Sequence, residues 1–63
     1  MELSEYFDKE IEFHTKLHTM AKEAMIKAYE NKSIEEVQQW GNIMSQENTI
    51  VMTLANCKHA LVA

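Results

Sequence analysis

Three residues in the first half of the chain have the types and the spacing that metal chemistry uses. Glu10, His14 and His18 follow one another at intervals of four residues, so on a helix their side chains share one face. Two histidines four residues apart on a helix can bind a divalent metal. A helical hairpin could bring Glu47 near His14 or Leu17, which makes Glu47 the fourth candidate ligand.

These four candidates do not reproduce a known bundle motif. Metal-binding bundles use inward Glu-x-x-His pairs, whereas Glu10 precedes His14 by four residues. We therefore expect no functional metal site and no cofactor, with Glu10 partly solvated and both histidines half-buried beside a hydrogen-bond partner. A pH-sensing role is the alternative for His14, because a buried imidazole at a dimer axis would destabilise the dimer when protonated.

Nucleophilic catalysis has little support in the sequence. Cys57 and His59 are two residues apart, so on a helix they point to different sides. No glycine-rich phosphate loop and no familiar triad spacing occur. The chain is therefore expected not to be an enzyme, and Cys57 is expected to be a small core residue.

Charge and composition narrow the class of protein further. The 63 residues have a net charge of −4 and no arginine, which argues against strong nucleic-acid binding. No proline and a single glycine exclude a turn-rich β fold. The most apolar stretch, residues 49–63, is shorter than a membrane span and carries Lys58. We expect no membrane association and a cytoplasmic location, with Cys57 reduced.

The pattern of apolar residues predicts two helices. The first is expected over about residues 4–30 and the second over about 34–62, joined by a turn at 31–33. Ser33 and Glu36 match the capping-box pattern at the start of the second helix. Gly41 lies inside that helix, which we expect to continue through it, although a break there would give three helices.

So short a turn makes the two helices antiparallel neighbours. The predicted fold is therefore an all-α, antiparallel two-helix hairpin forming one domain over residues 1–63. The chain has more apolar surface than two stripes can bury, so we expect a homodimer that forms a four-helix bundle, or docking into a larger partner. The expected interface residues are Phe13, Leu17, Met20, Trp40, Met44, Ile50, Val51, Leu54 and Leu61.

This assembly implies a function in binding. We expect a small non-enzymatic protein–protein interaction module, such as an adaptor, an inhibitor or a regulatory subunit, that binds itself and an unidentified protein. In length and layout the hairpin resembles the Rop family of plasmid copy-number regulators, which implies RNA binding through the first helix as an alternative. The residues that would serve are Lys9, Phe13, Lys16 and Lys22. A metal- or ligand-binding bundle is the other alternative.

Overall fold

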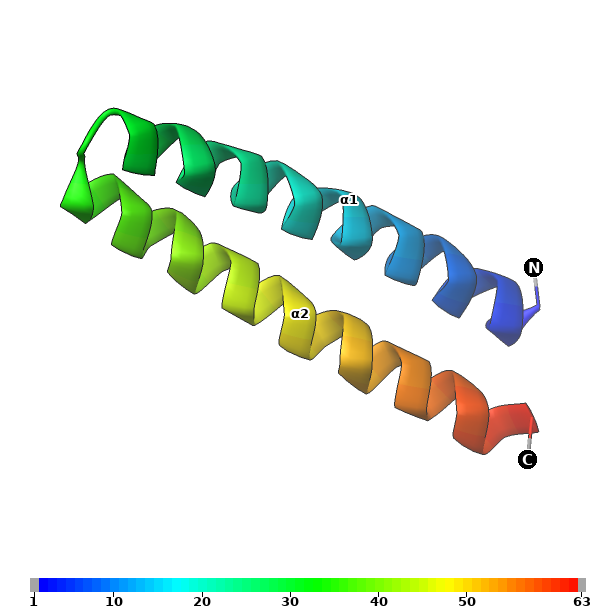
Figure 1. Ribbon diagram of the computed structural model, residues 1–63. Helices are drawn as coiled ribbons and strands as arrows, with labels where there is room; N and C mark the ends of the chain where they lie inside the picture. Colours follow the sequence, from blue (N-terminus) through cyan, green and yellow to red (C-terminus); the bar gives the residue numbers. More distant parts are fainter. Residues whose placement is uncertain (1, 63) are drawn as a thin grey trace.

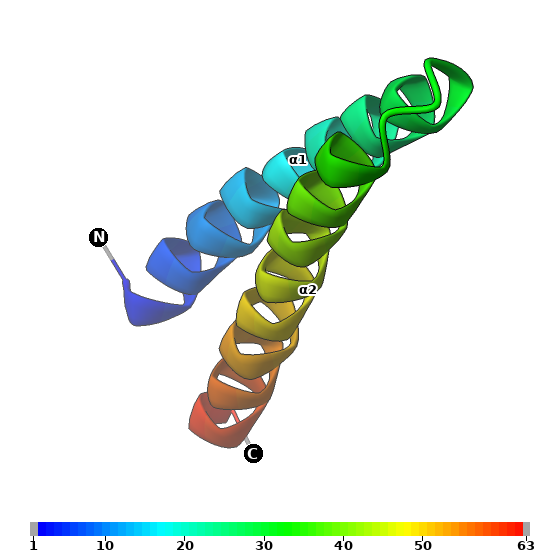
Figure 2. The ribbon, with the colours of Figure 1, turned by 90° about the vertical axis from the view of Figure 1, so that its left-hand side faces the viewer.

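Two long antiparallel helices make up nearly all of the protein. The structure, a computed structural model, describes residues 2–62, so the two end residues of the expected domain lie outside it. Helix α1 spans Leu3–Glu30 and helix α2 spans Ile34–Val62. They lie side by side with both chain ends at the same end (Figure 1), and they cross at a shallow angle (Figure 2). The prediction of an all-helical fold with two packed helices is confirmed.

The sequence favours these helices at several levels. Acidic residues occupy the first turn of each helix, Glu5 in α1 and Glu35 and Glu36 in α2, while Lys27 lies in the last turn of α1. These charges complement the helix dipole. The predicted start of α1 differs by one residue, since the helix begins at Leu3 and the Glu2 carbonyl already accepts from the N–H groups of Glu5 and Tyr6.

A seven-residue repeat on each helix forms the contact between α1 and α2. In α1 these residues alternate at intervals of three and four, which is the pattern of a coiled-coil seam. All of them are buried or half-buried. We call this contact the inner seam; in α1 it contains Phe7, Ile11, His14, His18, Ala21, Met25 and Ala28, and in α2 it contains Val37, Met44, Val51 and Lys58.

The inner seam includes Ile11 and Met25, which were not among the expected interface residues. Both are half-buried, whereas the expected interface residues Phe13 and Met20 are exposed. The inner seam repeats every 3.5 residues. The side of α1 that packs on α2 is therefore rotated slightly about the helix axis from the side that carries most of the large apolar residues.

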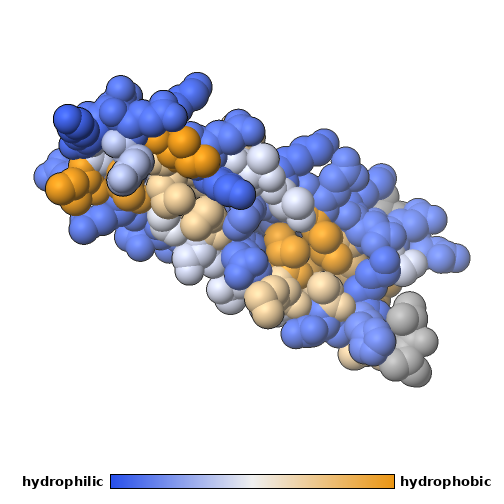
Figure 3. Space-filling view, in the orientation of Figure 1, coloured by the Kyte–Doolittle hydropathy of each residue, from blue (hydrophilic) through white to orange (hydrophobic). Residues whose placement is uncertain are grey.

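The pair of helices is only one layer thick. Its Cα atoms span 45 × 16 × 11 Å, whereas stable domains usually pack at least two layers round a core. Among the described residues only Ala21 and Ala28 are buried, with 1% and 2% of their surface exposed. One broad side is mostly hydrophilic with separated apolar patches (Figure 3). The hairpin therefore has a seam but no closed core.

The turn ends α1 with a left-handed residue. Lys32 has φ of 58°, its N–H donates to the Tyr29 carbonyl at 3.0 Å, and the Ser33 N–H donates to the Ala28 carbonyl at 2.9 Å. These two bonds form a Schellman motif, which satisfies carbonyls that the helix end would leave free. This position usually favours glycine, because a side chain is strained in this conformation. Here a lysine occupies it.

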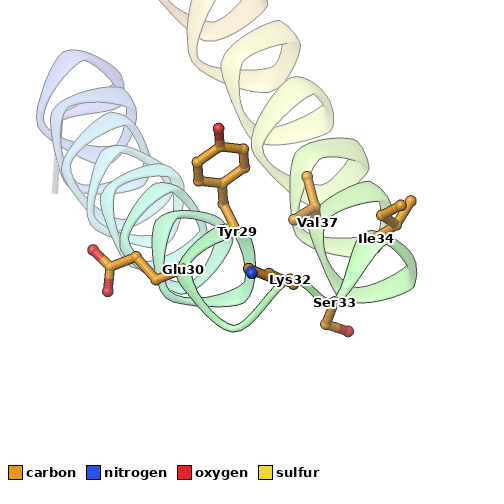
Figure 4. A pocket seen from close by; sticks show the side chains of 6 residues that line it. All are labelled: Tyr29, Glu30, Lys32, Ser33, Ile34 and Val37. Carbon is orange, nitrogen blue, oxygen red and sulfur yellow. The ribbon is translucent and has the colours of Figure 1, made fainter.

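Two local predictions for α2 have different outcomes. The capping box is wrong: no side-chain hydrogen bond of the described residues involves Ser33, whose hydroxyl points away from α2 (Figure 4). The unbroken helix is confirmed, since α2 continues through Gly41. A Cβ added at Gly41 would lie 3.6 Å from Met25 Sδ, an ordinary contact, so no close backbone approach requires glycine there.

Candidate functional site

Each helix carries a second apolar row beside the inner seam. The rows follow intervals of three and four, and a glutamate, Glu10 in α1 and Glu47 in α2, occupies one position of each row, so each row resembles a further coiled-coil seam. Most members are large and exposed. We call the two rows together the apolar face; α1 contributes Leu3, Tyr6, Phe13, Leu17, Met20 and Ala24, and α2 contributes Trp40, Ile43, Ile50, Leu54, Cys57 and Leu61.

The two rows lie on the same broad side of the hairpin. In α1 the exposed residues immediately precede seam residues, as Phe13 precedes His14, and in α2 Ile50 precedes Val51 in the same way. An antiparallel helix pair is related by an approximate two-fold axis perpendicular to its layer, and that rotation keeps each side of the layer in place. Residues offset in the same direction from their seams therefore share one side. This side is opposite to the one in Figure 3.

The apolar face leaves more surface in water than a protein of this size normally exposes. The chain has 4989 Å² of accessible surface, whereas a compact protein of its mass exposes about 4,200 Å². Phe13 is 56% exposed, Met20 63% and Leu61 54%. The excess of about 800 Å² equals what one partner buries in a standard protein–protein interface. Large apolar residues gathered in the open on one side of a soluble protein mark interaction sites.

The predicted interface residues fall into two groups. Met44 and Val51 belong to the inner seam and are half-buried between α1 and α2. The other seven lie on the apolar face, where Leu17 and Leu54 are half-buried beside the seam and the remainder are exposed: Phe13, Met20, Trp40, Ile50 and Leu61. Sequence reasoning did not include Tyr6 and Ile43, although their spacing from Phe13 and Ile50 follows the same seven-residue repeat.

Cys57 lies on the apolar face, contrary to the sequence prediction. It was expected in the core, but it is an exposed free thiol. Its position follows from the repeat, because Cys57 comes seven residues after Ile50 and immediately before Lys58 of the inner seam. Like the larger residues of the apolar face, Cys57 lies beside the inner seam and not in it, so a single hairpin leaves it exposed.

Three of the four candidate metal ligands meet in the middle of the hairpin. His14 Nδ1 is hydrogen-bonded to Glu47 Oε2, which joins α1 to α2, and His14 Nε2 lies 3.7 Å from Glu10 Oε2. The predicted approach of Glu47 to His14 is therefore confirmed. Only a protonated imidazole carries an N–H on both nitrogens, so the charged form of His14 can donate toward both carboxylates at once.

The arrangement of these side chains differs from a metal centre. The two carboxylates approach opposite nitrogens of His14, so the three groups do not converge on one point. His18, one turn after His14 in the inner seam, lies beside Thr15 and Asn48. Across residues 2–62, no group of three His, Cys, Asp or Glu side chains has the geometry to hold a metal ion.

The expected partial burial of the histidines is confirmed, with one difference. His14 and His18 are both half-buried, and the predicted hydrogen-bond partner of His14 is Glu47. His18 makes no side-chain hydrogen bond within the described part of the chain. Phe13 packs edge to face on the His14 ring, with 5.2 Å between the ring centroids.

The charged residues of the N-terminal turns are partly paired. Lys58 of α2 bonds to Asp8 of α1 and holds the open end of the hairpin together. Lys16 lies 3.2 Å from Glu12, one turn earlier on the same helix. Of the lysines that the Rop-like alternative requires, Lys16 is therefore engaged with a carboxylate in this structure.

A shallow apolar hollow lies at the turn, on the side away from the apolar face. It has a volume of about 430 Å³ and lies between Tyr29 of α1 and Ile34 and Val37 of α2 (Figure 4). Tyr29 is 75% and Ile34 73% exposed, so the hollow is open to solvent and is not a closed pocket. Its geometry indicates no particular ligand.

Neither helix, over the described residues, has a segment long and apolar enough to cross a membrane. Comparison of the chain with protein-family models, with curated proteins and with solved structures finds no match. What the protein does must therefore be inferred from the apolar face and from the charged residues round it.

Proposed function

We propose that the protein is a non-enzymatic protein–protein interaction module whose working form is a four-helix bundle made by two copies. The observation that carries this proposal is the apolar face, an exposed apolar surface that α1 and α2 share and that only Glu10 and Glu47 interrupt. Two layers packed through such faces form the core that one hairpin lacks. A closed two-fold assembly also explains why both helices carry complementary rows over their full length.

The areas involved are sufficient for a stable dimer. Two separate hairpins expose about twice 4989 Å², and a compact protein of double the mass exposes about 6,900 Å². Pairing of the faces would therefore remove about 3,000 Å² from water, which lies within the range of obligate homodimers. The low burial within the hairpin makes folding and association one coupled process.

The outer surface of such a bundle would be available to a second protein. Glu2 is the N-cap residue of α1, and Glu5 and Glu12 lie on its first three turns, outside the rows of the apolar face. Lys16 neutralises Glu12 in part, and the remaining charge is negative. A basic surface on a target would associate faster with this end, and the association rate would fall as salt concentration rises.

Analytical ultracentrifugation over a wide concentration range tests the proposal. We expect a dimer of 126 residues, twice the chain length, that loses helical circular dichroism as it dissociates on dilution. The variant Ile50→Asp places a charge in the centre of the apolar face and should shift the protein to poorly folded monomers. A rigid, fully helical monomer at micromolar concentration would contradict the proposal.

A metal-binding bundle is the second candidate, and one observation favours it. Glu47 is bonded to His14 and Glu10 lies 3.7 Å from it; these groups do not converge within one hairpin, so a site would need the second set that a dimer brings. Added Zn²⁺, Mn²⁺ or Fe²⁺ should then raise the thermal midpoint, and His14→Ala should abolish that rise. No change in midpoint with any of the three metals would remove this candidate.

A further inference from the structure

We infer that the apolar face is covered by a second copy whose turn lies at the same end of the bundle, so that each α1 packs on the partner's α2. This inference rests on the proposed self-association and specifies its geometry. Two arrangements are compatible with face-to-face pairing of two hairpins. With the turns at the same end, α1 meets the partner's α2; with the turns at opposite ends, each helix meets its own copy.

Contacts within one hairpin define which residues of α1 and α2 lie at the same level. Asp8 bonds to Lys58 near the open end, and His14 bonds to Glu47 in the middle. Near the turn, Met25 lies against Gly41. These contacts fix which parts of α1 and α2 lie at the same level to within about one helical turn.

A two-fold axis parallel to the helices keeps every residue at its level. In this arrangement the row of α1 meets the row of the partner's α2 in the register that the hairpin itself has. Large apolar residues then face each other along the bundle: Leu3 with the partner's Leu61, Tyr6 with the partner's Cys57, Phe13 with the partner's Ile50, and Met20 with the partner's Ile43.

The residues near the turn supply the evidence for orientation. Ala24 is the smallest member of the α1 row and lies level with Trp40, the largest member of the α2 row, so a large side chain meets a small one. Lys27 continues the α1 row, and Glu36 continues the α2 row at the same level. Lys27 would therefore meet the partner's Glu36, and symmetry makes this pair twice.

The opposite orientation loses these complementary pairs. It places Glu36 in an α2–α2 contact near the partner's Leu54 or Leu61, without a cation opposite. A carboxylate next to apolar side chains is costly unless a cation lies close to it. The remaining polar positions of the face, Glu10 and Glu47, already share His14 within their own hairpin in either arrangement.

Disulfide trapping with the native thiol tests the orientation. The variant Tyr6→Cys places a second thiol opposite the partner's Cys57 when the turns lie together. Mild oxidation should convert most of this variant into a covalent dimer on a non-reducing gel. Cys57→Ser in the same background should prevent the product, and the wild-type chain should give little, because its two thiols lie on diagonally opposite helices.

The matched variant for the opposite orientation is Trp40→Cys, which would approach the partner's Cys57 only when the turns lie apart. Covalent dimers from Trp40→Cys and none from Tyr6→Cys would overturn the inference while leaving the proposed function intact. A wild-type chain that sediments as a monomer would instead contradict the proposed function itself.

Charge reversal gives an independent readout without new thiols. Lys27→Glu should weaken the dimer at least tenfold, and Glu36→Lys added to it should restore most of that loss. Glu10→Lys added to Lys27→Glu serves as the control, because Glu10 is not level with the partner's Lys27 in either orientation and should restore nothing. A Glu36→Lys variant that restores no more than Glu10→Lys would overturn the inference.

Discussion

Truncation of Phe13 is the sharpest test of the apolar face. Phe13 is 56% exposed in the hairpin, and a phenylalanine side chain offers about 200 Å² to burial. A partner would thus cover about 110 Å², most of which Phe13→Ala removes. At about 25 cal/mol per Å², the loss is about 2 kcal/mol in each copy. The dimer loses about 4 kcal/mol, so its dissociation constant should rise about 1,000-fold.

The helix itself should tolerate this change, because alanine has a higher helix propensity than phenylalanine. Sedimentation equilibrium measures the dissociation constant, and circular dichroism at high concentration verifies that the helices persist. Tyr29→Ala is the matched control, since Tyr29 is 75% exposed but lies outside the apolar face. Equal dissociation constants for Phe13→Ala and Tyr29→Ala would refute the assignment of this face as the interface.

Three further changes test the energetics of the hairpin. Gly41→Ala should raise the free energy of unfolding by about 1 kcal/mol in urea titrations, because the added Cβ makes only an ordinary contact with Met25; a loss of stability would indicate that the dimer needs glycine there. Lys32→Gly should stabilise by a similar amount, about 1 kcal/mol, by relieving the left-handed conformation, and no change in the midpoint would contradict the described turn. Replacing His14 and Glu47 together with leucine should raise the thermal midpoint, because apolar packing commonly replaces a half-buried polar pair without loss. A fall in the midpoint would show that the pair is a net source of stability.

The helices and their packing were largely predictable from the sequence. The absence of proline, the three-and-four spacing of apolar residues and the break before Ser33 determine two helices and a short turn. The local chemistry of that turn was not predictable. A Ser33–Glu36 capping pattern competes with a Schellman motif, and a lysine at the left-handed position gives no signal, because glycine or asparagine normally marks it.

The sequence predicted most residues of the candidate site but not their division between the inner seam and the apolar face. Phe13, Leu17, Met20, Trp40 and Ile50 were all expected at an interface, yet counting apolar residues merged two adjacent rows into one stripe. The rows diverge by only about a quarter turn of the helix, and a list of apolar positions does not resolve that difference. Burial separates them, since all residues of the inner seam are buried or half-buried, whereas most residues of the apolar face are exposed.

The sequence by itself determined that the chain forms two amphipathic helices with an excess of apolar residues, because periodicity and composition are local properties. Only the tertiary structure decided which of these apolar residues are buried between α1 and α2 and which remain exposed for a partner. The contact between His14 and Glu47 and the exposure of Cys57 follow from the register between α1 and α2. Register depends on how two surfaces interlock over their whole length, and no single segment of the chain contains that information.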